Sequence, residues 1–195
     1  MNKWKLPTSL TVGGVDFQIR TDYRVVLGIY RYLNSPDYTD NEKWEIALRT
    51  FYKDIETMNP DLYVEAAQLM LDFFGCGATA TEEEKRKPQL MDWEHDADII
   101  IPAVNKVAGF DVRGMDYLHW WTFYALYMEI GEGTFSTVVG IRNKQAKGKK
   151  LEDYEREFVA DNPSLVMLRR HKTEQELREE AEDKAALAAL LGEGK

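Results

Sequence analysis

Four side chains that could bind a metal ion fall within a short stretch of this chain. They are Asp92, His95, Asp96 and Asp98, and a further imidazole, His119, lies in the next predicted helix. Carboxylates and imidazoles are the usual ligands of zinc, and Asp92 and His95 share a helix face because they are three residues apart. However, the chain has no His-x-x-x-His or Glu-x-x-His pair, and acids in a first helical turn also complement the helix dipole. A metal-dependent hydrolase that uses His95 or His119 therefore remains only an alternative.

No side chain in the sequence is arranged as a catalytic nucleophile. Cys76 is the single cysteine and stands between two glycines, with no neighbour that would lower the pKa of its thiol. His119 stands between Leu118 and Trp120, where a core histidine bonded to backbone or carboxylate is expected, and no Gly-x-Ser-x-Gly motif is present. The phosphate-binding glycine motifs of nucleotide sites are also missing from the sequence. We predict a protein that is not an enzyme and uses no metal or cofactor.

A run of cations without any acid is the most distinctive charged feature. It comprises Arg142, Lys144, Lys147, Lys149 and Lys150. Two interpretations stay open. The cations complement the dipole at the C-terminal end of a helix, or they form a basic patch that binds an acidic surface, such as that of another copy of the chain. Self-complementary charge of this kind favours head-to-tail association into a homo-oligomer, as a ring or an open helix.

The composition is that of a globular protein with a surplus of acids. The 195 residues suit one domain, or one domain with a tail, and the formal net charge is −9 at pH 7. That charge argues against nucleic acid, whose phosphates need a basic surface, and against an anionic membrane. A single cysteine permits no internal disulfide, which fits a reducing cytosol, and the N-terminus has no apolar run typical of a signal peptide.

The most hydrophobic predicted helix runs from Asp116, as its N-cap, to Ile130. Apolar and aromatic side chains fall on every side of it rather than on one stripe. Such a helix is buried, and this one is too short to span a membrane, which needs roughly 20 apolar residues. We therefore predict that it forms the centre of the core, with the other helices around it. Its hub side chains are Leu118, His119, Trp120, Trp121, Phe123 and Tyr124.

The N-terminal part, residues 1–75, is predicted to form a β-hairpin and three helices. Two β-prone runs, 9–12 and 15–19, flank Gly13-Gly14, and glycine supplies the positive φ of a tight hairpin turn. The alternating apolar residues of this hairpin predict one buried face: Leu10, Val12, Val15, Phe17 and Ile19.

Capping residues locate the three helices that follow the hairpin. Asp22 caps the first, which extends to about residue 34. Thr39 and Glu42 form a capping box for the second, whose apolar stripe continues from Trp44 to Ile55. The third helix begins at 59–60, an asparagine cap followed by proline, and ends at 75, a glycine.

We predict a mobile linker at residues 76–91 and a second helical half, built around the 116–130 helix, at residues 92–165. Asp92 is the predicted cap of a helix that Pro102 kinks or divides and Gly109 ends. Two more helices follow, one from about 135 to 147 and one from about 151 to 158.

The charged tail, residues 166–195, predicts an exposed helix with a thin apolar stripe. Thr173 and Glu176 form its capping box, and its partner-binding candidates are Leu177, Leu187 and Leu191. The predicted fold is therefore mainly α: one multi-helix globular domain with a short N-terminal β-hairpin and an exposed C-terminal helix.

Several of these motifs together resemble the bacteriophage gp-fifteen tail protein family. The resemblance covers roughly residues 6–165, and the His-Trp-Trp run followed by a basic Lys-Gly-Lys-Lys-Leu stretch is its most specific part. The segments that carry it are 118–123, Phe135, 141–144, 147–151, the opening Leu-Pro, the Gly13-Gly14 hairpin and 161–163.

The resemblance implies a non-enzymatic role in phage tail assembly. The implied function is that of a chaperone in the host bacterial cytoplasm. It would coat the tape-measure protein before tail-tube subunits polymerise around it. A structural tail component that stays in the virion is the alternative within the same class. The family supplies no catalytic residues.

Overall fold

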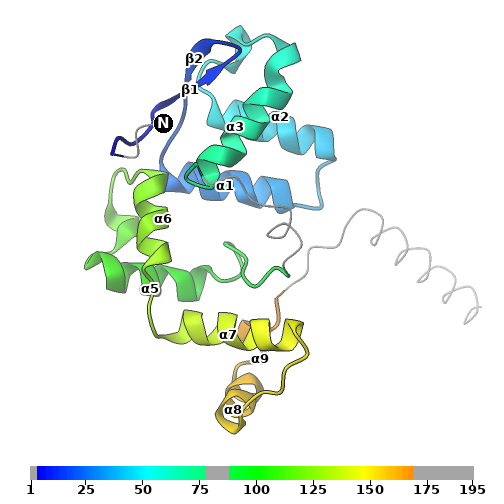
Figure 1. Ribbon diagram of the computed structural model, residues 1–195, viewed down its shortest axis with the longest axis vertical. Coiled ribbons are helices and arrows are strands. Elements are labelled where there is room, and N and C mark those ends of the chain that lie inside the picture. The colour runs from blue at the N-terminus through cyan, green and yellow to red at the C-terminus, as the bar shows by residue number, and fades with distance from the viewer. Residues whose placement is uncertain (1–3, 78–87, 169–195) are drawn as a thin grey trace, which may run out of the picture.

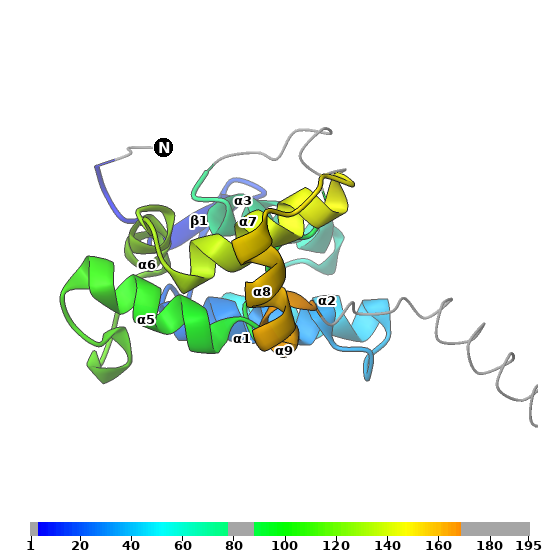
Figure 2. The ribbon, with the colours of Figure 1, turned by 90° about the horizontal axis from the view of Figure 1, so that it is seen from below.

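The computed structural model describes residues 4–77 and 88–168, and it confirms a mainly α fold with one N-terminal β-hairpin (Figure 1). The strands and helices are β1 (Ser9–Val12), β2 (Val15–Gln18), α1 (Tyr23–Asn34), α2 (Asp40–Phe51), α3 (Tyr63–Phe74), α5 (Ala97–Ala108), α6 (Trp120–Met128), α7 (Thr134–Ala146), α8 (Asp153–Asp161) and α9 (Pro163–Val166). The hairpin, α2 and α3 lie at one end of the molecule, and α7, α8 and α9 lie at the other (Figures 1 and 2). Most of the predicted linker (78–87) and the predicted C-terminal helix lie outside the described residues.

The hairpin forms as predicted, with β1 antiparallel to β2 and Leu10 opposite Phe17. Gly13 and Gly14 make the turn with φ of +56° and +83°, the pair of positive angles that a two-residue primed turn requires. The prediction of one fully buried face is wrong at Val15, which is 57% exposed because it lies at the turn. The ribbon is anchored to the helices, since the Gly13 N–H donates to Glu65 on α3.

The caps of the first helices are confirmed. The Asp22 side chain accepts the Arg24 N–H at the start of α1, and Thr39 with Glu42 forms the capping box of α2. The predicted extension of α2 to Ile55 is wrong. The chain leaves the helix at Tyr52, where it adopts an extended conformation and pairs with Ile19 in an isolated β-bridge.

Helix α5 begins later than predicted and is continuous. Asp92 is not its cap: the Asp92 carboxylate accepts the N–H groups of Glu94 and His95 in a separate turn, and the helix starts after Asp96. Pro102 lies inside one helix, so the alternative of two short helices is wrong. Gly109 ends it with φ of +77°, as its type predicts.

Helix α6 differs most from its prediction. It begins at Trp120, and its N-cap is His119 rather than Asp116. Only Trp120 and Phe123 of this helix are buried, and Met128 near its end is 63% exposed. The helix packs against α1 and α5 (Figure 1), its two tryptophans reach the end of α3, and Tyr127 meets Phe135 of α7. It therefore contacts several other helices, but the prediction that it is buried on every side is wrong, because part of its surface stays exposed.

Candidate functional site

Two carboxylates of the suspected metal site, Asp92 and Asp96, accept hydrogen bonds from backbone N–H groups. Asp92 Oδ1 accepts the backbone N–H groups of Glu94 (2.9 Å) and His95 (2.8 Å), and Asp96 Oδ2 accepts that of Asp92 (3.0 Å). Asp98 instead lines a separate pocket against the turn at 129–135. Among residues 4–77 and 88–168, no three His, Cys, Asp or Glu side chains form a group that could hold a metal ion. The geometry gives the hydrolase alternative no support.

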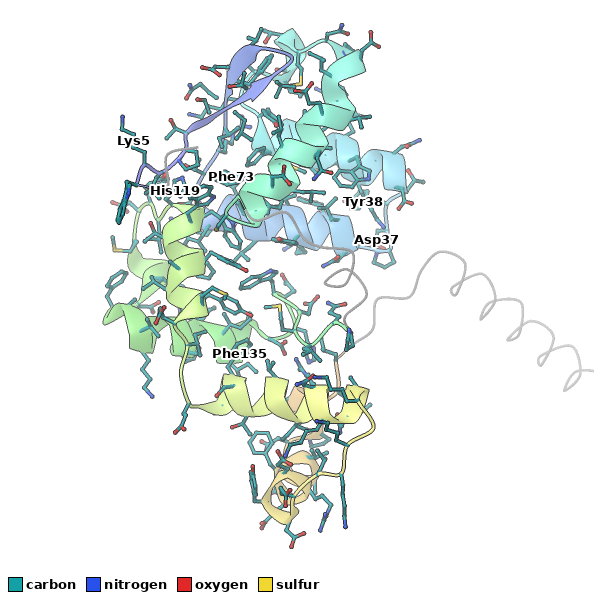
Figure 3. The ribbon with its side chains drawn as sticks, in the orientation of Figure 1. Lys5, Asp37, Tyr38, Phe73, His119 and Phe135 are labelled. Carbon is teal, nitrogen blue, oxygen red and sulfur yellow. The ribbon has the colours of Figure 1, made fainter. Side chains whose placement is uncertain are left out.

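His119 uses both of its ring nitrogens to hold the backbone. Nδ1 accepts the Trp121 N–H (3.0 Å), which is the capping bond of α6, so Nε2 carries the proton and donates to the Pro7 carbonyl (3.0 Å). Burial lowers the pKa of His119, because the charged imidazolium would be desolvated. The ring also meets Phe73 edge-on, with ring centroids 5.8 Å apart. Figure 3 labels both side chains. His119 is a structural cap, and as a neutral ring it has no free nitrogen for catalysis.

The two tryptophans after His119 close the end of another helix. Trp120 Nε1 donates to the Phe74 carbonyl and Trp121 Nε1 donates to the Phe73 carbonyl, both at 2.9 Å. These carbonyls belong to the last turn of α3, where C=O groups lack partners in the helix, and the Phe73 carbonyl also accepts the Cys76 N–H (3.0 Å). The two adjacent indoles therefore bind two adjacent carbonyls at this helix end. We call His119, Trp120 and Trp121, with the carbonyls of Pro7, Phe73 and Phe74, the aromatic joint.

The hub side chains differ in burial. Leu118, His119, Trp120 and Phe123 are buried, whereas Trp121 and Tyr124 are only partly buried. Trp120 is fully enclosed and stacks on Phe123, with ring centroids 5.8 Å apart. The first four side chains therefore belong to the core, and Trp121 lies at its edge.

Arg142 is not part of an exposed basic patch, so that prediction is wrong. Its side chain is 4% exposed and faces Asp96, whose side chain is 1% exposed. The two parallel bonds between them measure 2.7 and 2.8 Å. The three remaining N–H donors reach the carbonyls of Leu90 (3.0 Å), Val166 (3.0 Å) and Leu165 (2.5 Å), so all five donors of the guanidinium are used. We call Arg142 and Asp96, with these three carbonyls, the arginine joint.

A signal for this burial was present in the sequence. Arg142 follows Phe135 by seven residues and Val138 by four, so all three share the buried face of α7. Arginine rather than lysine also suits a buried pair, because its planar fork matches a carboxylate with two bonds. The partner Asp96 lies 46 residues away, and only the folded chain identifies it.

The four lysines of the run divide into one paired and three exposed side chains. Lys144 Nζ lies 2.7 Å from Glu155 on α8, and this bond lowers the pKa of the Glu155 carboxyl. Residues 147–150, which we call the lysine loop, follow α7 and expose Lys147, Lys149 and Lys150. No salt bridge reaches these three lysines from any residue that the structure describes. They lie next to the C-terminal end of α7, so the dipole interpretation is compatible with an exposed basic surface.

The thiol of Cys76 is a poor nucleophile. Burial raises its pKa to about 11, so it is protonated at neutral pH. Its backbone has φ of +55°, in the left-handed region that ends helix α3. The remaining predicted partner-binding residues, Leu177, Leu187 and Leu191, lie outside the described residues.

Sequence reasoning missed an apolar groove between α2 and α3. It has a volume of about 630 Å³. Its apolar lining residues are Trp44, Leu48, Tyr63, Val64, Ala67 and Leu71. A signal was present in α3, where the apolar residues Val64 and Leu71 lie off the buried face that Ala66, Met70 and Phe73 form. The groove is open and mainly apolar, so it could receive a partner.

Comparison with known proteins identifies the family of this chain. The profile of the family described as "Bacteriophage Gp15 protein" matches residues 3–184 of 195. The chain therefore belongs to this bacteriophage family, as its motifs indicated. No curated protein and no solved structure gives a significant match. In the part of the chain that the structure describes, no helix has the length and apolar character needed to cross a bilayer.

Proposed function

We propose that this protein is a tail-assembly chaperone that binds the tape-measure protein of a long-tailed phage. Membership of the bacteriophage Gp15 family, over nearly the whole chain, is the observation that carries the proposal. The protein acts in the host bacterial cytoplasm and leaves the tape-measure protein when tail-tube subunits polymerise around it.

The surface of the protein supports a binding role. The groove between α2 and α3 is apolar and open, which is the shape used to bind an amphipathic helix. A long helical partner offers many such segments, so weak binding at each site can cover it through many copies. The polar groups of His119 and Arg142, which would be the obvious candidates for chemistry, are instead committed to backbone contacts.

Self-association belongs to the same proposal. The three exposed lysines of the lysine loop lie at the end of the molecule opposite α2 and α3 (Figure 1). Contact between a basic end and an acidic surface of the next copy gives head-to-tail order, in which neighbouring copies cover adjacent segments of one long partner.

Co-expression with tape-measure fragments tests the chaperone function. The expected result is that fragments which are insoluble alone become soluble and co-purify with this protein. No co-purification and no gain in solubility across the whole tape-measure sequence would refute the function. Mass spectrometry of purified virions is the second measurement: a chaperone is missing from finished particles, whereas its presence at structural amounts would favour a tail component.

A further inference from the structure

The α2–α3 groove is formed by two rows of side chains, one from each helix. On α2 the lining residues Asn41, Trp44, Glu45 and Leu48 recur at helical spacing, and on α3 a second row runs from Tyr63 to Leu71. A row of nine residues on a helix is about 12 Å long, which equals about two turns of a bound helix. Two turns accommodate three anchors, at positions i, i+3 or i+4, and i+7.

Within residues 4–77 and 88–168, no element covers the three most exposed apolar side chains of the groove. Val64 is 84% exposed, Leu71 is 38% exposed and Trp44 is 37% exposed. Leu48 is buried and Ala67 packs on the core, so these two side chains join the groove to the core. Three large apolar side chains gathered on one open groove indicate a binding site, because single exposed ones are common and grouped ones are not.

The groove lies in an acidic part of the chain. Residues 37–72 contain nine Asp or Glu and three Lys or Arg, which is a net charge of −6 out of −9 for the whole protein. Glu45 is itself a lining residue, and its only described ion pair is with Arg49, in the open, with its side chain 62% exposed. A partner with basic residues beside its apolar stripe would therefore be attracted to this groove.

We infer that the α2–α3 groove binds a two-turn amphipathic helix of the tape-measure protein whose apolar stripe is flanked by Lys or Arg. This inference rests on the proposed chaperone function and names the surface that performs it. Apolar anchors supply the binding energy, and the acidic surroundings select the basic flank and speed association.

Two segments of the chain itself fit the groove less well. The lysine loop of a second copy has the complementary charge, but it offers only Ala146 and Leu151 as apolar neighbours and turns at Gly148 with φ of +63°. The tail, residues 169–195, carries seven acids and six Lys or Arg, so its charge does not favour an acidic site. A basic, apolar helix matches both properties of the groove.

Overlapping peptides that cover the tape-measure protein of the same phage are the probe, and the full-length protein is the binder. The variant Val64→Asp places a carboxylate among the groove anchors, and its fold is preserved because Val64 is exposed. Tyr154→Asp on α8 is the matched control, since Tyr154 is an exposed aromatic residue on another helix. We expect Val64→Asp to lower the affinity for the bound peptides by roughly tenfold or more. The control variant Tyr154→Asp should bind the same peptides with unchanged affinity. Glu45→Lys should lower the affinity for the same peptides at low salt, and this difference from the wild type should vanish at high salt.

Three results would overturn the inference. If peptides bind the wild type and Val64→Asp equally, the groove is not their site, and the chaperone function stands on another surface. If a photo-crosslinker at Val64 reacts with residues 147–151 or 169–195 in the presence of saturating peptide, the chain itself occupies the groove. If no peptide binds the wild type and no longer tape-measure fragment co-purifies with it, both the inference and the proposed function fail.

Discussion

Two buried joints hold distant parts of this chain together, and they use opposite chemistry. In the aromatic joint, neutral donors on His119, Trp120 and Trp121 bind carbonyls of the N-terminal arm and of α3. In the arginine joint, one charged guanidinium binds the Asp96 carboxylate and three carbonyls from the segments at residues 90 and 165–166. Both joints bind backbone carbonyls that belong to distant segments of the chain.

The difference lies in what each joint does when it is damaged. Removal of an indole leaves a neutral carbonyl without that donor and a cavity, and the surrounding rings can relax into the cavity. A buried guanidinium that is removed leaves a carboxylate without its counter-charge, in a site that water does not reach. We therefore expect the arginine joint to be the more fragile under mutation, although the aromatic joint buries more apolar surface.

Arg142→Met should give the largest loss. It leaves Asp96 unpaired and releases three carbonyls, so the free energy of unfolding should fall toward the upper end of roughly 3–5 kcal/mol, measured by urea denaturation. The double variant with Asp96→Leu should recover part of that loss, because the orphaned charge is gone. Arg156→Met, which removes an ion pair with Asp153 on the surface of α8, is the control and should change little. A loss below about 1 kcal/mol for Arg142→Met would show that the joint is solvated.

Trp120→Ala should be the next largest, and Trp121→Ala should be clearly smaller. Trp120 is fully enclosed, and truncating a buried tryptophan costs about 3–5 kcal/mol. Trp121 makes the same kind of bond but is only partly buried, so about half that loss is expected. The comparison uses the same urea measurement on both variants. Equal losses would mean that the carbonyl bonds, rather than apolar burial, determine the strength of the aromatic joint.

Acid should weaken the aromatic joint through His119. Folding lowers the pKa of His119 below its ordinary value of about 6.5. Just below pH 6.5 the imidazole is therefore protonated in the unfolded chain but neutral in the folded protein. Stability is therefore unaffected above about pH 7 and falls as the pH drops from about 6.5 to the lowered native pKa. His119→Asn keeps a capping side chain and removes this titration. Urea denaturation at pH 7.5 and pH 5 should show a smaller acid loss in His119→Asn, and an identical loss would contradict the assignment.

Exchanging the lysine loop should have the smallest effect on stability. Lys147, Lys149 and Lys150 are exposed and unpaired within the described structure, so changing all three to Glu should leave the unfolding midpoint almost unchanged. The same variant should reduce self-association at low salt, measured by sedimentation velocity, and the difference should vanish at high salt. A large loss of stability would show that these lysines, like Arg142, make contacts that hold the fold together.

Local rules explain why part of the fold was predictable. The Gly13-Gly14 turn, the Asp22 cap and the Thr39 capping box each depend on residues within four positions of one another, and all three are confirmed. The sequence did not identify His119 as the cap of α6. That role also depends on the Pro7 carbonyl, 112 residues away, which accepts the Nε2–H of the ring. Asp116 is the better cap by residue type alone.

The sequence alone determined the helical class, the hairpin, most helix ends and the phage family, because these follow from short-range patterns and specific motifs. The tertiary structure decided which of the five cations between 142 and 150 is buried, which tryptophan is enclosed, and where the open groove lies. Each of these depends on which distant segment covers a side chain. Burial sets the cost of an unpaired charge and the gain from apolar contact, so the same residue type is a structural joint at one position and a binding surface at another.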